Sequence, residues 1–184
     1  MDDRPAAEDR YAGLLREMRY RSGVLDGYPS RLHYFSEWIA DNARRGLLVD
    51  LGGELGGVID REPIDFMSTH PDAYRQLSRP ENLRAHPGGG GAPRREDRVY
   101  VPEEAIPDVA DRIRNGDVIA ATSTVPGLDI AHTGLALWID GRLHLLPRTP
   151  SSARRSKSAK RRSPNASSAS KARSGLMIAR PQGR

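Results

Sequence analysis

The amino-acid sequence predicts an α+β domain in which helices pack on an antiparallel sheet. Two observations carry this prediction. Apolar residues in the first fifty positions recur with helical spacing, whereas three stretches between residues 118 and 146 have the composition of neighbouring strands. Helices followed by a meander of strands are typical of the α+β class. The 184 residues suffice for one domain of ordinary size with its own core.

Two amphipathic helices are predicted near the start of the chain. The first spans Ala6 to Arg21 and is followed by a stop signal at Ser22-Gly23, and its apolar stripe requires a core to lie against. The second spans Leu32 to Arg45, because basic residues in its last turn favour the helix dipole and Gly46 suits the position after its end. The stripe of the first helix consists of Tyr11, Leu14, Leu15 and Met18.

The middle of the chain has shorter signals. A glycine-rich turn at residues 52–57 lacks the lysine and helix context of a phosphate-binding loop, so we expect it to be structural. Turn residues and short apolar runs predict the elements around it. These elements are strands at residues 58–59, 64–67 and 99–101, and short helices at residues 73–77 and 109–113.

The strongest β signal comes from three runs that follow one another closely. They span Val118 to Val125, Thr133 to Ile139 and Arg142 to Leu146. Asp140-Gly141 separates the last two and is typical of a two-residue type I′ hairpin turn. We therefore expect neighbouring antiparallel strands.

Charge is distributed unevenly. The net charge is +5, but nine of the 29 Lys and Arg residues lie in 147–173 with no acidic residue, so the rest of the chain is acidic. Residues 147–174 are rich in Ser, Arg and Lys without apolar periodicity, which predicts a disordered segment. Nucleic-acid binding through this segment is an alternative function that steep salt dependence would reveal. Residues 175–184 are expected to form a short strand and a tail.

The choice between lysine and arginine suggests a hypothesis for this basic segment. It holds every lysine of the chain, whereas residues 1–146 use arginine alone. Back-translation with the frame displaced by two bases over residues 153–173, or by one base over residues 85–97, permits segments with apolar periodicity. We therefore hypothesise that both stretches are translated out of frame.

Several classes of protein are excluded or disfavoured by composition. The absence of cysteine excludes disulfides, thiolate metal sites and a cysteine nucleophile within these residues. The five histidines show no metal-binding spacing, so no metal and no cofactor is expected. No apolar run is long enough to span a membrane, and the acidic start lacks the features of a signal peptide, so the sequence as it stands predicts a cytoplasmic protein.

One histidine has the setting of a general base. His132 precedes a predicted strand and stands among small residues that would leave its ring accessible. A histidine hydrogen-bonded at a strand edge is the structural alternative. Asp129 could orient an imidazole, or fix the preceding turn at Pro126-Gly127.

Seven segments occur in a specific order over most of residues 9–146. They are Ser30 to Ile39, Leu55 to Gly57, Phe66 to Ser68, Val99 to Pro102, Gly116 to Ala120, Asp129 to Ala136 and Leu143 to Leu146. Together these segments resemble the N-acetylmuramoyl-L-alanine amidase-like family of bacterial proteins, in the NlpC-type, papain-like superfamily. One such motif would be weak evidence, whereas the ordered set is specific.

The resemblance implies a partial papain-like fold over residues 1–146. In the family, a cysteine at the head of a helix attacks an amide of a peptidoglycan stem, a histidine takes its proton, and a third polar residue orients the histidine. His132 matches the base. The nucleophile would lie upstream of Asp9, so we expect a truncated and inactive relative. The orienting histidine would follow residue 146, where this chain has Pro147. His144 is a substitute candidate that strand alternation directs to the other face.

The resemblance also implies a ligand and a location. Arg31, His33, Tyr34 and Asp129 are the candidate substrate-binding residues, because cationic and aromatic groups suit a sugar-peptide with carboxylates. Tyr34 is alternatively part of the core under its helix. The implied partners are peptidoglycan fragments, and the implied location is the periplasm or envelope. A module that binds cell-wall fragments or a partner without catalysis is the alternative function.

Overall fold

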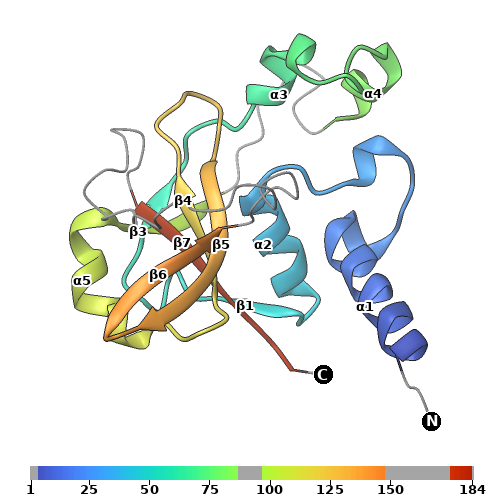
Figure 1. Cartoon of the computed structure of the whole chain (residues 1–184). Helices are drawn as coiled ribbons and strands as arrows, with labels where there is room; N and C mark the ends of the chain where they lie inside the picture. The colour runs from blue at the N-terminus through green and yellow to red at the C-terminus, as the bar shows by residue number, and fades with distance from the viewer. Residues whose placement is uncertain (1–3, 87–96, 148–174, 184) are drawn as a thin grey trace, which may run out of the picture.

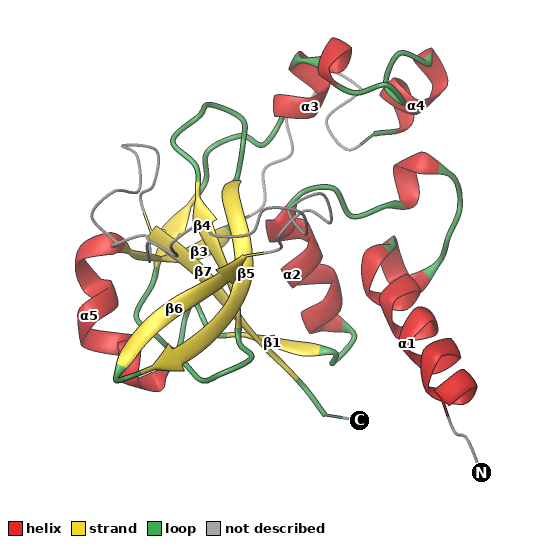
Figure 2. Ribbon diagram, in the orientation of Figure 1, coloured by secondary structure: helices red, strands yellow, loops and turns green. Residues whose placement is uncertain are grey.

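The computed structural model describes residues 4–86, 97–147 and 175–183. It confirms the predicted α+β class, with helices around a seven-stranded antiparallel sheet (Figure 2). The stretches that we hypothesise to be out of frame fall mainly outside the described residues. The predicted disordered segment does so as well, except for Pro147, which ends a strand.

The strands form one sheet in the order β2-β3-β7-β4-β5-β6, and β1 also pairs with β7. Every pairing is antiparallel. The bounds are β1 Leu48–Asp50, β2 Val58–Asp60, β3 Arg98–Pro102, β4 Val118–Thr122, β5 Ile130–Ile139, β6 Arg142–Pro147 and β7 Gly175–Pro181. The predicted meander corresponds to β4, β5 and β6.

The last strand of the chain lies in the middle of this sheet. β7 pairs with β4 along one edge, and with β3 and β1 at the two ends of its other edge (Figure 1). Its residues Met177, Ile178 and Ala179 are buried. The short strand expected at the end of the sequence therefore connects the two halves of the sheet.

Alternate residues of β7 enter two different cores. Ile178 packs with Ile119, Val101 and Ile113 in one cluster, which residues of the segment around α5 also contact. Met177 and Ala179 pack with Leu48 and Ile39 in the other, which lies under α2. The alternation follows from the two-residue period of a strand. Helices therefore lie against both faces of the sheet.

The helices only partly follow the sequence-based boundaries. They are α1 Arg4–Arg19, α2 Phe35–Arg44, α3 Phe66–Thr69, α4 Pro80–Ala85 and α5 Ile106–Val109. The strand predicted at residues 64–67 is wrong, because α3 begins there, and the helix predicted at residues 73–77 is a 3-10 turn at Pro71–Ala73 followed by turns. Both runs are too short for periodicity to separate strand from helix. Within the described residues, no helix is both long and apolar enough to cross a membrane.

Glycines explain the backbone of two predicted turns. Asp140 and Gly141 both have positive φ, 50° and 70°, as a type I′ turn requires. In the 52–57 turn, a Cβ on Gly57 would approach the carbonyl oxygens of Gly52 and Tyr100 to 2.8 Å. Close backbone packing therefore explains this glycine.

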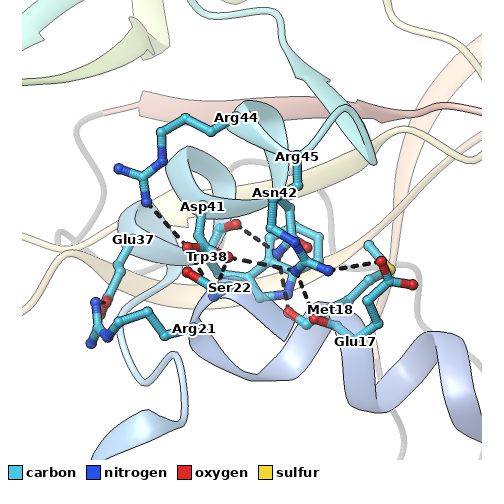
Figure 3. Close-up of polar contacts among 10 residues, drawn as sticks. All are labelled: Glu17, Met18, Arg21, Ser22, Glu37, Trp38, Asp41, Asn42, Arg44 and Arg45. Carbon is cyan, nitrogen blue, oxygen red and sulfur yellow. Dashed lines mark hydrogen bonds and ion pairs between the residues drawn. The ribbon is translucent and has the colours of Figure 1, made fainter. Parts of the chain in front are cut away.

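The expectation that the apolar stripe of the first helix lies against a core is wrong. Tyr11, Leu14 and Leu15 on α1 are 65%, 36% and 40% exposed. The helix instead contacts α2 through polar groups (Figure 3). Asn42 donates to the carbonyl of Met18 at 3.0 Å, and Arg45 donates to the carbonyl of Glu17 at 2.8 Å.

This polar contact completes the last turn of α1. The final carbonyl groups of a helix lack partners within the helix, so their bonds must come from elsewhere. Leu32 donates to the carbonyl of Arg19 at 3.0 Å, next to the bonds that Asn42 and Arg45 make. Arg21 pairs with buried Glu37 (Figure 3). The end of α1 and the segment after it are therefore fixed against α2.

Candidate active site

A cleft of about 650 Å³ lies where α2 and β5 begin. Figure 1 shows both starts at the same end of the sheet. Three stretches of the chain form most of the cleft: the end of α1 with residues 28–38, the segment 67–76, and the loop before β5 with its first residues. The predicted site residues Arg31, His33, Tyr34, Asp129 and His132 all line the cleft, and His144 does not.

Asp129 connects the sheet to the first turn of α2. Its Oδ2 atom accepts hydrogen bonds from the backbone N–H and the hydroxyl of Ser36, each at 2.9 Å, although the two residues are 93 positions apart. The carboxylate is 5% exposed. The residue before α2, Tyr34, makes no side-chain cap. Asp129 therefore supplies the cap, and its negative charge suits the positive end of the helix dipole.

The loop that carries Asp129 is held on a second side. The N–H groups of Asp65 and Phe66 donate to the carbonyl of Gly127 at 3.1 and 3.0 Å. Gly127 has φ of 76°, and a Cβ there would come within 2.9 Å of the Phe66 nitrogen. Glycine is therefore required where this loop meets α3. The Asp129 carboxylate bonds to Ser36, and we find no bond from it to the Pro126-Gly127 turn.

His132 follows an irregularity in β5. The register passes from Ala121 opposite His132 to Thr122 opposite Ile130, so Ala131 has no partner. Such bulges redirect side chains and are common beside active sites. The ring of His132 is exposed and hydrogen-bonds to none of the residues that the structure describes. His132 therefore lines the cleft with a side chain that is open to solvent.

The register also locates the two positions considered for an orienting group. His144 lies opposite Leu137, and Pro147 lies opposite Gly134. Gly134 is two residues after His132 and so shares its face of the strand. Position 147 is therefore on the side of His132, whereas His144 is on the other side. This geometry agrees with the alternation argument against His144.

His33 lies in a cluster of tilted rings on the cleft wall. Its ring centroid lies 4.5 Å from that of Tyr28 and 5.2 Å from that of His86. Its Nε2 donates to the carbonyl of Tyr28 at 3.3 Å, which fixes the tautomer. The pKa of His33 is lowered from 6.5 to about 4, mainly by burial; this hydrogen bond opposes the shift, and the nearby His86 and Arg31 contribute to it. His33 is therefore neutral at pH 7.

Tyr34 presents a protonated phenol to the same cleft. It is 2% exposed, and its hydroxyl oxygen accepts the N–H of Met67 at 2.8 Å. Burial raises the pKa of Tyr34 to about 12, and nearby Asp129 contributes in the same direction. No acceptor for the phenol hydrogen is found among the described residues. Tyr34 therefore belongs to the core and can also donate to a ligand carbonyl.

Arg31 lies exposed at the mouth of the cleft, as a substrate-binding role requires. The sequence analysis missed Ser36 and Arg19. Ser36 lies within a recognised motif, but nothing in its spacing indicates that it bonds to Asp129. Arg19 also lines the cleft and has no sequence signal. Within the described part of the chain, no group of three or more His, Asp or Glu residues is placed to hold a metal ion.

Comparison with known proteins places this geometry in a family. A family model described as N-acetylmuramoyl-L-alanine amidase-like matches residues 3–161. An N-acetylmuramoyl-L-alanine amidase from Bacteroides uniformis is 33% identical, with a TM-score of 0.82 over 96% of this chain and 75% of that one. A Bacteroides fragilis protein described as a xylanase is 36% identical, with a TM-score of 0.79 over 94% and 76%.

A more distant likeness concerns the fold alone. A Legionella pneumophila protein is 18% identical, with a TM-score of 0.66 over 95% of this chain and 70% of that one. Among curated proteins, no match was found.

The bond between Asp129 and Ser36 leads to a prediction about stability. We expect Asp129→Asn to lower the free energy of unfolding by about 1–2 kcal/mol, because the helix loses a charged cap, and Ser36→Ala to lower it by about 1 kcal/mol. Urea unfolding followed by circular dichroism measures both. The matched controls, Asp140→Asn and Ser78→Ala at exposed turns, should change stability by less than about 0.5 kcal/mol. Equal effects at Asp129 and Asp140 would contradict this role.

The environment of His33 leads to a prediction about pH. Its pKa is about 4 in the folded protein and 6.5 in the unfolded chain, so the unfolded chain binds the proton first as pH falls. The neutral ring thus contributes stability above pH 6.5 that is lost between pH 6.5 and 4. Stability measured at pH 7, 6 and 5 should fall less steeply in His33→Gln than in the parent. An NMR titration midpoint of His33 near 6.5 would disprove the assignment.

Proposed function

The chain belongs to the N-acetylmuramoyl-L-alanine amidase-like family, and on that premise we propose that its cleft binds an amide-linked fragment of bacterial peptidoglycan. The observation that carries the proposal is that His132 lines the same cleft as Arg31 and Tyr34, which lie about a hundred residues earlier in the chain. A base, a hydrogen-bond donor and a cation are the groups that an amide flanked by carboxylates requires.

His132 takes the role of general base in this proposal. His132 lines the cleft, and its exposed ring can accept the proton of a nucleophile that attacks the amide carbon. The bond between Asp129 and Ser36 holds the loop before β5 next to the first turn of α2, and so fixes the start of the strand that carries His132. We propose that the arrangement is papain-like, with its third polar residue expected near position 147.

The 184 residues do not contain the thiol that such a mechanism uses. Ser36 carries a hydroxyl in the first turn of α2 that could be considered as a nucleophile, but it donates directly to Asp129. None of the described histidines hydrogen-bonds to it, so no base activates it. We therefore propose that this polypeptide binds its ligand without turning it over, and that the nucleophile lies on a segment upstream of these residues.

Glycoside hydrolysis fits the cleft less well. Most glycosidases use two carboxyl groups on opposite sides of the scissile bond. Among the described residues that line the cleft, Asp129 is the one carboxylate, and it is buried and bonded to Ser36. The cleft thus favours amide over glycoside chemistry. Peptidoglycan as ligand implies that a working protein acts in the cell envelope.

Ligand binding and turnover can be tested on the same sample. We expect N-acetylmuramoyl-L-alanyl-D-glutamate to bind saturably in calorimetry, with no free peptide or sugar released in chromatography over a day. Thr133→Trp should abolish binding because exposed Thr133 lines the cleft, whereas Thr124→Trp on the adjacent loop should not. Release of product by the purified chain would refute the inactivity, and identical binding by both tryptophan variants would refute the site.

We further propose that residues 85–97 and 153–173 are out-of-frame readings of a normal family sequence. The supporting observation is that β3 and β7, which follow these stretches directly, pair with each other inside the sheet. Sequencing the gene with several hundred bases upstream of Met1 tests this. We expect shifted frames free of stop codons over both stretches, and an upstream cysteine codon at the head of a helical segment. A stop codon in the shifted frames would rule out the hypothesis.

A further inference from the structure

We propose that Arg19 and Arg31 form an arginine pair that binds a carboxylate of the ligand at the mouth of the cleft. This inference rests on the proposed function and adds to it the ligand group and a second residue that recognises it. Both side chains line the cleft and both are exposed.

The backbone brings the two arginines onto neighbouring segments. Arg19 is the last residue of α1, and Arg31 directly follows the 3-10 turn Tyr28–Ser30. Tyr20 and Arg31 form an isolated antiparallel bridge, and the N–H of Leu32 donates to the carbonyl of Arg19 at 3.0 Å. The two residues therefore belong to one short pairing of segments that are twelve positions apart in the chain.

The position of this pairing does not depend on the arginines themselves. Asn42 and Arg45 of α2 bind the carbonyls of Met18 and Glu17, one and two positions before Arg19. Both guanidinium groups are thus carried on a backbone fixed to α2, whose first turn Asp129 holds against the sheet. Such a prearranged site loses less conformational entropy when a ligand binds.

The charges around the pair leave it available for an anion. Within the described part of the chain, neither Arg19 nor Arg31 has an acidic partner, whereas neighbouring Arg21 pairs with Glu37 and Arg45 pairs with Glu17. The carboxylate of Asp129 is already bonded to Ser36. The cleft mouth therefore has positive charge that no acidic side chain of the described residues neutralises.

A carboxylate group matches the chemistry of the cleft mouth. Guanidinium groups offer planar pairs of donors that match the two oxygens of a carboxylate. The neighbouring ring of His33 is neutral at pH 7 and adds no competing charge. The aromatic rings of Tyr28 and Tyr74 line the same cleft and offer an apolar wall for the chain that bears the carboxylate.

The test compares two ligands that differ only in charge. Calorimetry would measure binding of N-acetylmuramoyl-L-alanyl-D-glutamate and of its diamide, at 20 and 300 mM salt. We expect the diacid to bind about tenfold more tightly at low salt, because hydrogen bonds between charged groups are lost in the diamide. The preference should shrink at high salt, because the pair is exposed.

Variants assign the preference to the two arginines. Arg19→Gln and Arg31→Gln should each weaken binding of the diacid and leave the diamide within twofold of the parent. Arg10→Gln, on the same helix but outside the cleft, should change neither ligand. Arg31→Lys keeps the charge and should retain part of the preference. Unchanged circular dichroism and melting temperature confirm that the variants are folded.

The outcomes separate this inference from the proposed function. If both ligands bind the parent equally, the arginine pair is refuted and the proposed function stands. If the diacid preference persists in the double glutamine variant, another group recognises the carboxylate and the pair is again refuted. If neither ligand binds at all, both proposals are refuted.

Discussion

The bond between Asp129 and Ser36 is the contact on which the candidate site depends. It joins the loop before β5 to the first turn of α2. The start of β5, which carries the base candidate His132, is thereby held at a fixed distance from the cleft wall formed by Arg31 to Tyr34. A buried carboxylate is stable only when it is hydrogen-bonded, and here a free N–H group in the first turn of a helix donates to it. The same hydrogen bond gives this N–H group the acceptor that it lacks within the helix.

Helix α2 carries this constraint outward to α1. The side of α2 that bears Ile39 packs against the sheet, while Asn42 and, just past the helix, Arg45 bond to the end of α1 (Figure 3). Asp41 accepts the N–H of Ser22, which follows α1. Polar contacts are directional, so they set the orientation of α1 more strictly than its apolar stripe could. Arg19 is brought to the cleft by these contacts, and the stripe itself remains exposed.

The cleft combines groups whose ionisation is controlled by burial. His33 stays neutral and Tyr34 stays protonated because their charged forms would lose contact with water. The unneutralised charge is carried by exposed arginines at the mouth. A ligand with an anionic group and an amide would meet matching groups in the cleft, which is why we favour a peptide of the cell wall over a neutral polysaccharide.

Local patterns in the sequence determined the parts of this protein that depend on near neighbours. Helical spacing located α1 and α2, and Asp140-Gly141 located the β5–β6 hairpin, because these elements are selected by residues within a few positions of one another. The ordered motifs located His132 at the start of β5. Composition alone excluded a thiol within these residues.

Only the tertiary structure decided which distant segments meet. Spacing cannot show that Asp129 caps a helix 93 residues earlier, that β7 occupies the centre of the sheet, or that the end of α1 pairs with the segment at Arg31. Helical periodicity shows that α1 is amphipathic, but it does not show which partner covers the apolar face. For this reason the sequence predicts a core contact that the structure does not have. Which distant contacts form depends on the free energy of the whole fold, and a local sequence pattern does not contain this information.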